Sequence, residues 1–151
     1  MKKYQFRLEP VLKLRKLTEE NCRMELGQLM SELVIIEEKL THDRTEANRY
    51  FAIQEESLKK GIRGGQLQAY PMLVAAKEQS IKSLLKEKAT QEYRIEQKRM
   101  ELNVLRGELK VIENLKEKDY NEYRKAFNKE VDQKVEEQTQ IWMNNNRDTK
   151  A

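Results

Sequence analysis

The sequence contains few of the residues that interrupt helices. Its 151 residues include 2 prolines and 5 glycines, and three of the glycines, Gly61, Gly64 and Gly65, lie close together. In a helix interior, proline costs roughly 3 kcal/mol and glycine roughly 1 kcal/mol relative to alanine. Both sides of this glycine cluster can therefore form long helices, and the cluster itself predicts a reversal of the chain.

Metal ligands and disulfide partners are also scarce. The chain has one cysteine, Cys22, and one histidine, His42. One thiol cannot form an internal disulfide, and one thiol with one imidazole is too small a set for a zinc site. We expect neither a metal nor a cofactor, and we expect Cys22 to act as a small apolar residue of a helix seam.

The sequence has no long apolar run. The longest runs are residues 33–36 and 72–76, which are far shorter than a helix that spans a bilayer. Lys2 and Lys3 are not followed by the apolar core of a signal peptide. The sequence therefore predicts a cytoplasmic protein.

Catalytic motifs are missing too. Residues 61–65 lack the Gly-Lys-Ser/Thr ending of a phosphate loop and follow a predicted helix instead of a strand. His42 lies beside a seam position, on a flank that we expect to be solvated. Charged residues make up 37% of the chain and aromatic residues 7%, which is typical of long helices and not of a core that encloses a cleft. We predict that the protein is not an enzyme.

Apolar residues recur at coiled-coil spacing on both sides of the glycine cluster. In the first stretch nine of twelve seam positions are apolar; its a positions are Leu12, Glu19, Leu26, Leu33, Leu40 and Ala47, and its d positions are Arg15, Cys22, Leu29, Ile36, Asp43 and Tyr50. In the second stretch twelve of eighteen are apolar; its a positions are Leu67, Val74, Ile81, Lys88, Ile95, Leu102, Leu109, Lys116 and Tyr123, and its d positions are Tyr70, Lys77, Leu84, Gln91, Lys98, Leu105, Ile112, Asp119 and Ala126. Alternating steps of three and four residues predict two helices that pack along one seam.

We therefore predict an all-α fold, an antiparallel two-helix coiled-coil hairpin with a longer second helix. A single coiled-coil domain is expected over residues 1–151. Its parts are helix 1 at about 10–60, the bend at 61–66, helix 2 at about 67–143 and a frayed tail at 144–151, where Asn144–Asn146 end the helix. Gly61 is placed to cap helix 1 in a left-handed conformation.

The short linker makes the two helices antiparallel neighbours. We favour a register in which paired residue numbers sum to about 131, so that Leu26 faces Leu105 and Asp43 meets Lys88. This register also sets Arg15 near Lys116. A register one heptad away would place residue 26 opposite residue 98.

Both ends of the hairpin carry candidate binding residues. The terminal end is apolar at Tyr4, Phe6, Leu8, Val11, Leu12 and Leu14 and basic at Lys2, Lys3, Arg7, Lys13, Arg15 and Lys16. These residues either enter an apolar or acidic socket of a partner or pack against the overhang of helix 2. At the other end Tyr50, Phe51, Tyr70, Met72 and Leu73 crowd the bend, as a binding patch or as local packing.

The opening segment carries a family resemblance. Residues 4–15, Tyr-Gln-Phe-Arg-Leu-Glu-Pro-Val-Leu-Lys-Leu-Arg, resemble the Phe-x-Leu-x-x-Leu-like start of the FliJ family, a coiled-coil component of the bacterial flagellar type III protein export apparatus. The chain length, the glycine-containing bend followed by Tyr70, and the charged second arm with residues 115–120 are similar to that family as well.

The resemblance implies a non-enzymatic stalk, similar to the central stalk of rotary ATPases. It implies that the terminal end binds the ring of the export ATPase, with Phe6, Arg7, Leu8, Leu12 and Arg15 as candidate contacts. It implies that the bend end binds the cytoplasmic domain of the export gate, with Tyr50, Tyr70 and Leu73 as candidate contacts. Export chaperones are further implied partners, and nucleic acid is not. The protein would be cytoplasmic and reach the inner membrane through its partners only.

Three other functions remain open on the sequence. The chain could be a coiled-coil stalk of a non-flagellar type III secretion system or of a rotary ATPase. It could be a generic coiled-coil scaffold that forms homodimers through the same seams, whereas our interpretation predicts a monomer in dilute solution. An RNA-binding helical hairpin is the weakest alternative, because aromatic residues are not interleaved with arginine as single-strand binding requires.

Overall fold

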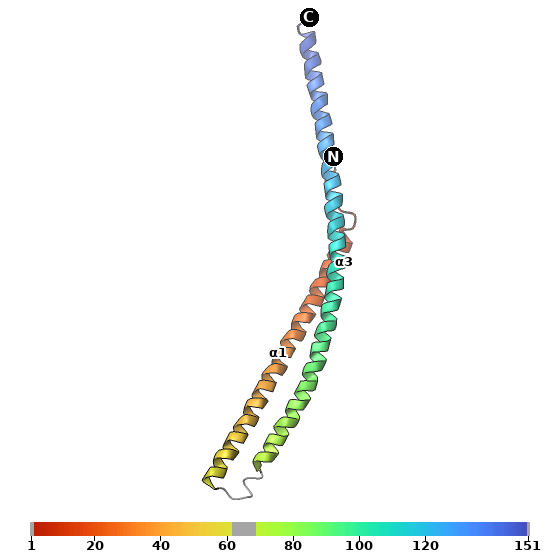
Figure 1. Cartoon of the computed structure of the whole chain (residues 1–151). Helices are drawn as coiled ribbons and strands as arrows, with labels where there is room; N and C mark the ends of the chain where they lie inside the picture. Colours follow the sequence, from red (N-terminus) through yellow and green to blue (C-terminus); the bar gives the residue numbers. More distant parts are fainter. Residues whose placement is uncertain (1, 62–68, 151) are drawn as a thin grey trace. The chain divides into compact units, whose positions relative to one another are not determined.

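The fold consists of two antiparallel helices. The structure is a computed structural model, and it describes residues 2–61 and 69–150. Within these residues the chain forms two α-helices and no strand (Figure 1): α1 spans Glu9–Lys60 and α3 spans Ala69–Asp148. This confirms the predicted all-α hairpin with the longer second helix.

Proline and glycine lie where the helices start and stop. Pro10 is the second residue of α1 and Pro71 the third residue of α3, positions where a missing backbone N–H leaves no hydrogen bond unmade. Gly61 follows the last residue of α1 with a φ of 72°, which confirms its predicted left-handed cap. Gly64, Gly65 and Leu67, with most of the predicted bend at 61–66, lie outside the described residues.

The C-terminal end of α3 differs from the prediction. The sequence predicts that the helix ends near residue 143 and leaves a frayed tail at 144–151, but α3 continues to Asp148. Asparagine costs a helix well under 1 kcal/mol per residue, and neither glycine nor proline follows residues 144–146. Three asparagines are therefore too weak a signal to stop an established helix.

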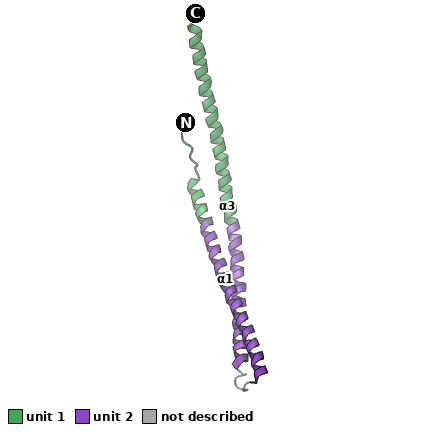
Figure 2. Ribbon diagram, turned by 90° about the vertical axis from the view of Figure 1, so that its left-hand side faces the viewer, with its two compact units in different colours: residues 1–19, 104–151 green, residues 20–103 purple. Residues whose placement is uncertain are grey.

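The contacts of the chain divide into two compact units, each built from both helices (Figure 2). Unit 1 contains Met1–Glu19 and Val104–Ala151, and unit 2 contains Glu20–Asn103. In each unit, a segment of α1 packs against an antiparallel segment of α3. Every interhelical hydrogen bond and ion pair described below joins residues of the same unit.

The buried residues of both units follow the predicted heptad frame. All twelve seam positions of the first stretch are buried or half-buried, and so are all but two of the described seam positions of the second. The two exposed ones are Asp119 and Ala126, which follow Lys116, the partner of the first residue of α1, Glu9. The predicted seam is therefore confirmed over the paired part of both helices.

The register between the helices corrects the prediction by one heptad. Interhelical ion pairs join Glu9 to Lys116, Glu25 to Lys98, Glu37 to Lys88 and Glu46 to Lys77, at 2.9, 2.6, 3.7 and 3.2 Å. Paired numbers thus sum to 123–125, where we expected about 131. In this register Leu26 lies opposite Lys98 and not Leu105, and Asp43 contacts Lys77 and not Lys88.

The cost of burying charge explains this register. The predicted register would place Asp43 opposite Lys88 in one layer of the seam and Arg15 opposite Lys116 in another. Each of these layers would then bury two charged side chains. In the observed register each polar seam residue lies opposite an apolar one, as Lys98 does opposite Leu26. Its stem can cover the apolar neighbour while its ammonium group reaches Glu25 at the flank.

This register is open to a direct test. Cysteines at positions 26 and 98, in a chain whose Cys22 is replaced by serine, are expected to form an intramolecular disulfide in high yield under mild oxidation. Cysteines at 26 and 105 are expected to remain reduced, because one heptad along a helix is about 10 Å. Non-reducing electrophoresis of the two variants measures both yields. Efficient bonding of 26 to 105 would restore the register that sums to 131.

Candidate partner-binding surfaces

The N-terminal segment of unit 1 lies against α3 through aromatic residues. The Tyr4 ring packs against Tyr120 and Tyr123, with centroid distances of 5.1 and 5.2 Å. The Tyr4 hydroxyl donates to a carboxylate oxygen of Asp119 at 3.1 Å, and the Tyr123 hydroxyl donates to the backbone carbonyl of Lys2 at 3.0 Å. We call Tyr4, Tyr120 and Tyr123 the tyrosine clasp. It holds the nonhelical residues 2–8 beside α3.

The five residues predicted to bind an ATPase occupy different environments in unit 1. Arg7 is exposed, and Phe6 and Leu8 are half-buried. Arg15 is half-buried, and its guanidinium donates to the backbone carbonyl of Glu108 at 2.8 Å. Leu12 is only 2% exposed, so a partner could not touch it while the helices remain paired. Arg7 and Phe6 are therefore the candidates most accessible to a partner while the helices remain paired.

Beyond the clasp, α3 has no partner helix among the described residues. The aromatic row continues from Tyr123 to Phe127, whose ring centroids are 6.3 Å apart. Phe127 is followed by further exposed apolar side chains on this part of α3: Val131, Val135, Ile141, Trp142 and Met143. The terminal end thus combines a basic N-terminal segment with apolar helix surface, as the sequence predicts.

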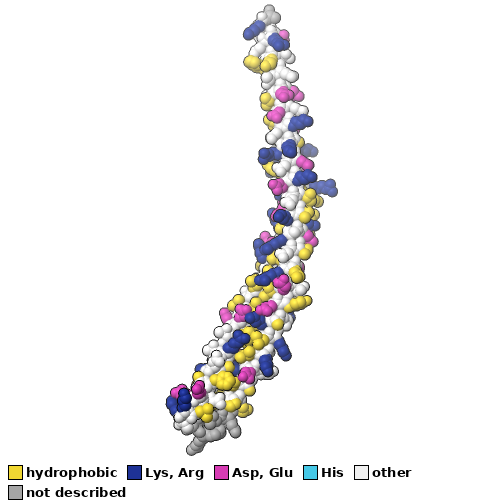
Figure 3. Space-filling view, viewed as in Figure 1, with side chains coloured by type: hydrophobic (Ala, Val, Ile, Leu, Met, Phe, Trp, Pro, Cys, Tyr) yellow, Lys and Arg dark blue, Asp and Glu magenta, His cyan; other side chains and the backbone are white. Residues whose placement is uncertain are grey.

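The residues predicted to bind an export gate lie at the other end of α1 and at the start of α3, in unit 2. Tyr50 and Tyr70 are half-buried seam residues, and Leu73 is exposed. Phe51 and Met72 are exposed as well. Figure 3 shows hydrophobic side chains among charged ones on the surface near the bend. The bend end therefore presents apolar side chains to solvent.

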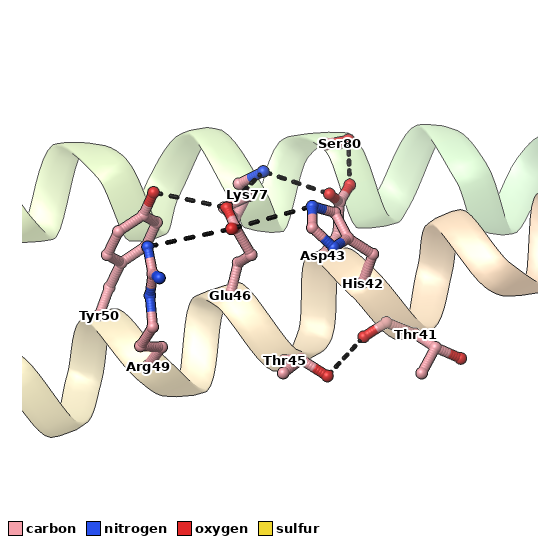
Figure 4. Close-up of polar contacts among 9 residues, drawn as sticks. All are labelled: Thr41, His42, Asp43, Thr45, Glu46, Arg49, Tyr50, Lys77 and Ser80. Carbon is pink, nitrogen blue, oxygen red and sulfur yellow. Dashed lines mark hydrogen bonds and ion pairs between the residues drawn. The ribbon is translucent and has the colours of Figure 1, made fainter.

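A polar cluster interrupts the seam just behind these residues (Figure 4). Asp43 accepts hydrogen bonds from the Ser80 hydroxyl at 2.5 Å and from the Lys77 ammonium at 3.3 Å. The same ammonium lies 3.2 Å from Glu46. Glu46 in turn accepts from the Tyr50 hydroxyl at 3.5 Å. The cluster ties Tyr50 to both helices through an unbroken chain of contacts.

The charges of this cluster stabilise one another. The hydrogen bond from Ser80, followed by that from Lys77, holds the pKa of Asp43 below its ordinary value. The hydrogen bond from Lys77 lowers the pKa of Glu46. The two carboxylates, Glu46 first, raise the pKa of Lys77. All three groups therefore remain charged near neutral pH.

Neither a cluster of metal ligands nor a membrane-spanning helix is found in the described residues. No group of three or more His, Cys, Asp or Glu residues in this part of the chain could hold a metal ion. Nor does this part contain a helix that is long and apolar enough to cross a membrane. What the surface offers is apolar and charged area for contact with other proteins, at the terminal end and at the bend end.

Sequence reasoning missed two features of these surfaces. The tyrosine clasp was not foreseen, although tyrosines three residues apart at 120 and 123 lie on one side of a helix. The polar cluster was not foreseen either, because its partners depend on the register. In the sequence, Asp43 and Lys77 are seam positions, and the predicted register pairs Asp43 with Lys88 instead of Lys77.

Comparison with known families decides the assignment. The family model described as flagellar FliJ protein matches residues 4–147, nearly the whole chain. The chain belongs to the FliJ family. No curated protein and no solved structure matches it. The family match confirms the resemblance seen in the opening segment and the bend.

Family membership makes this FliJ-family chain a component of the flagellar export apparatus. The family is non-enzymatic. The flagellar assignment of the family favours a role in flagellar export over a generic scaffold or an RNA-binding hairpin. Which residues contact which partners stays a prediction, for Phe6, Arg7, Leu8, Leu12 and Arg15 as for Tyr50, Tyr70 and Leu73.

Proposed function

We propose that the chain is a stalk-like coiled coil that links the ring of the flagellar export ATPase to the export gate. In this proposal unit 1 binds the ATPase ring, and the bend end of unit 2 binds the cytoplasmic domain of the gate. Export chaperones bind the same protein, and the contact with the inner membrane is indirect, through these partners. The observation that carries the proposal is the family match over residues 4–147.

The surface of unit 1 supports an ATPase contact. Lys2, Lys3 and Arg7 are exposed beside the half-buried Phe6, and the apolar row of α3 continues past the clasp without a partner helix in the described chain. Aromatic and arginine side chains are the residues that most often dominate a protein interface. An acidic and partly apolar socket would complement this surface.

The surface of unit 2 supports a separate contact at the bend end. Leu73, Phe51 and Met72 present apolar area to solvent, and the polar cluster fixes Tyr50 beside them. A rigidly held aromatic residue loses little conformational freedom when a partner binds. The polar cluster thus supports Tyr50 as an anchor for this contact.

A double substitution at the terminal end tests the ATPase contact. Phe6→Asp with Arg7→Glu is expected to weaken binding to the export ATPase at least about tenfold, because it removes an aromatic anchor and reverses a charge. Stimulation of ATP hydrolysis is expected to fall in parallel. Pull-down and ATPase assays with the full chain measure the two effects.

Two control variants separate the two ends. Leu17→Asp changes a side chain that is 55% exposed on α1, and it is expected to leave ATPase binding intact. Leu73→Asp is expected to leave ATPase binding intact and to weaken binding to the cytoplasmic domain of the gate. Undiminished ATPase stimulation by the Phe6 and Arg7 variant would show that the terminal end is not the ATPase contact.

A further inference from the structure

Four apolar side chains of unit 1 form an exposed patch on one flank of the hairpin. Val11 and Leu14 of α1 are 37% and 63% exposed, and Val111 and Leu115 of α3 are 57% and 45% exposed. All four occupy positions c or g of the heptad frame, which adjoin each other beside the seam. We call these four residues the flank patch.

The charged pairs of this unit lie on the opposite flank. Lys116 pairs with Glu9 at 2.9 Å and Arg106 with Glu19 at 3.3 Å. Each pair joins an a position to an e position, and e positions lie across the seam from g positions. The flank with the e positions is therefore polar and satisfied internally, whereas the flank patch is apolar and uncovered in the described chain.

The two halves of the flank patch, one on each helix, lie at the same level along the helix axes. Val11 lies opposite Leu115, and Leu14 lies opposite Val111, because the residue numbers of each pair sum to 125 or 126, close to the register of the ion pairs. The four side chains therefore form a compact block and not two staggered rows. Depletion of charge at the centre is typical of the core of a protein interface.

The row on α3 continues with one charge at each end. Glu108, Val111, Leu115 and Lys118 follow one another at steps of three, four and three residues. Glu108 and Lys118 are exposed, and neither side chain has an ion pair within the described residues. In an antiparallel copy of the helix, the row runs from Lys118 to Glu108. The steps are again three, four and three residues, and the positive and negative ends have exchanged places. The row is therefore complementary to its own antiparallel copy.

We propose that the flank patch binds a second copy of this chain in a two-fold symmetric, antiparallel dimer. Val111 of each copy meets Leu115 of the other, and Glu108 of each copy pairs with Lys118 of the other. The same axis sets Val11 against Leu14 of the second copy, because both rows are centred at the same height. This inference goes beyond the proposed ATPase and gate contacts and does not depend on them.

The interface is small, so the dimer is expected to be weak. Four apolar residues from each copy with two symmetric ion pairs place it at the low end of specific interfaces, below about 1,200 Å² of total buried area. Such contacts are concentration-dependent and transient. The chain is therefore expected to be monomeric when dilute and dimeric towards millimolar concentration.

Charge exchange between two variants tests the pairing. Glu108→Lys and Lys118→Glu each place like charges together in a homodimer, and each alone is expected to weaken self-association at least about tenfold. An equimolar mixture of the two variants restores opposite charges at both ends and is expected to form heterodimers with the affinity of the unchanged chain. Sedimentation equilibrium from about micromolar to millimolar concentration measures all four samples.

Two further variants show where the dimer forms. Val111→Asp is expected to abolish association, whereas Val135→Asp, at a residue 56% exposed but outside the patch, is expected to leave it unchanged. Circular dichroism checks that each variant keeps its helices. The proposal is overturned by an unchanged chain that stays monomeric over the whole range, by a charge-exchanged mixture that stays monomeric, or by equal losses from Val111→Asp and Val135→Asp.

Discussion

Replacing Leu12 with aspartate is expected to separate the two helices at the terminal end of unit 1. Leu12 is the most buried large side chain of the described residues, and it shares a seam layer with the buried Ile112. Loss of a buried leucine removes roughly 1.5–3 kcal/mol of apolar stabilisation. The new carboxylate adds a desolvation cost, which the helices can avoid only by opening.

This result changes how a loss of ATPase stimulation is to be interpreted. Leu12→Asp is expected to lower stimulation at least as much as the Phe6 and Arg7 variant does, but by opening the binding surface and not by removing a contact. Amide hydrogen exchange distinguishes the two, because only Leu12→Asp should lose protection over residues 9–19 and 104–118.

Leu17→Asp is the matched control, since the same change at this exposed position should alter stability by about 0.5 kcal/mol or less. If Leu12→Asp keeps the exchange protection of the unchanged chain, the seam layer with Ile112 is not formed.

Replacing Lys77 with methionine is expected to destabilise unit 2 more than any surface substitution. The change leaves the Asp43 carboxylate in the seam with the Ser80 hydroxyl but without its cation. Glu46 loses the same partner. A second change, Asp43→Leu in the Lys77→Met chain, is expected to restore stability, because apolar side chains then occupy both seam positions and no unpaired charge is left there. Thermal unfolding followed by circular dichroism measures both variants.

The pH dependence gives an independent readout of the same cluster. The folded-state pKa values of Asp43 and Glu46 are lowered, so their stabilisation is fully present above the unfolded values, about 4, and is lost as the pH falls through the folded values. Unfolding temperatures at pH 7 and pH 3 should therefore differ less for the double variant than for the unchanged chain. Glu56→Gln, at an exposed pair with Lys60, serves as the control. An identical pH response in all three chains would contradict this role of the cluster.

The seam was predictable because it depends on local spacing. Steps of three and four residues place Leu40 and Leu84 on the inner side of their helices whatever the partner, and both are buried. Gly61 was predictable for a similar reason, since a left-handed residue after a helix is most often glycine. The FliJ-family assignment depended on the opening segment and the bend, which are less generic than the helices.

The register was not predictable from spacing alone, because a shift of one heptad leaves every seam residue in the seam. The choice is made by the flanking charges, whereas the predicted register rests on the direct pairing of Asp43 with Lys88. Charged seam residues instead reach sideways, as Lys77 does to Glu46. The polar cluster and the flank patch both follow from the register, so neither could be described before it was known.

The tyrosine clasp has a practical consequence for any work with tagged protein. The Lys2 carbonyl is itself a partner of Tyr123, so a fusion placed ahead of it would crowd the surface that a binding assay is meant to report. A tag joined after Asp148 is separated from Tyr123 by some 25 residues of α3, and it leaves the first residues of the chain in their native position.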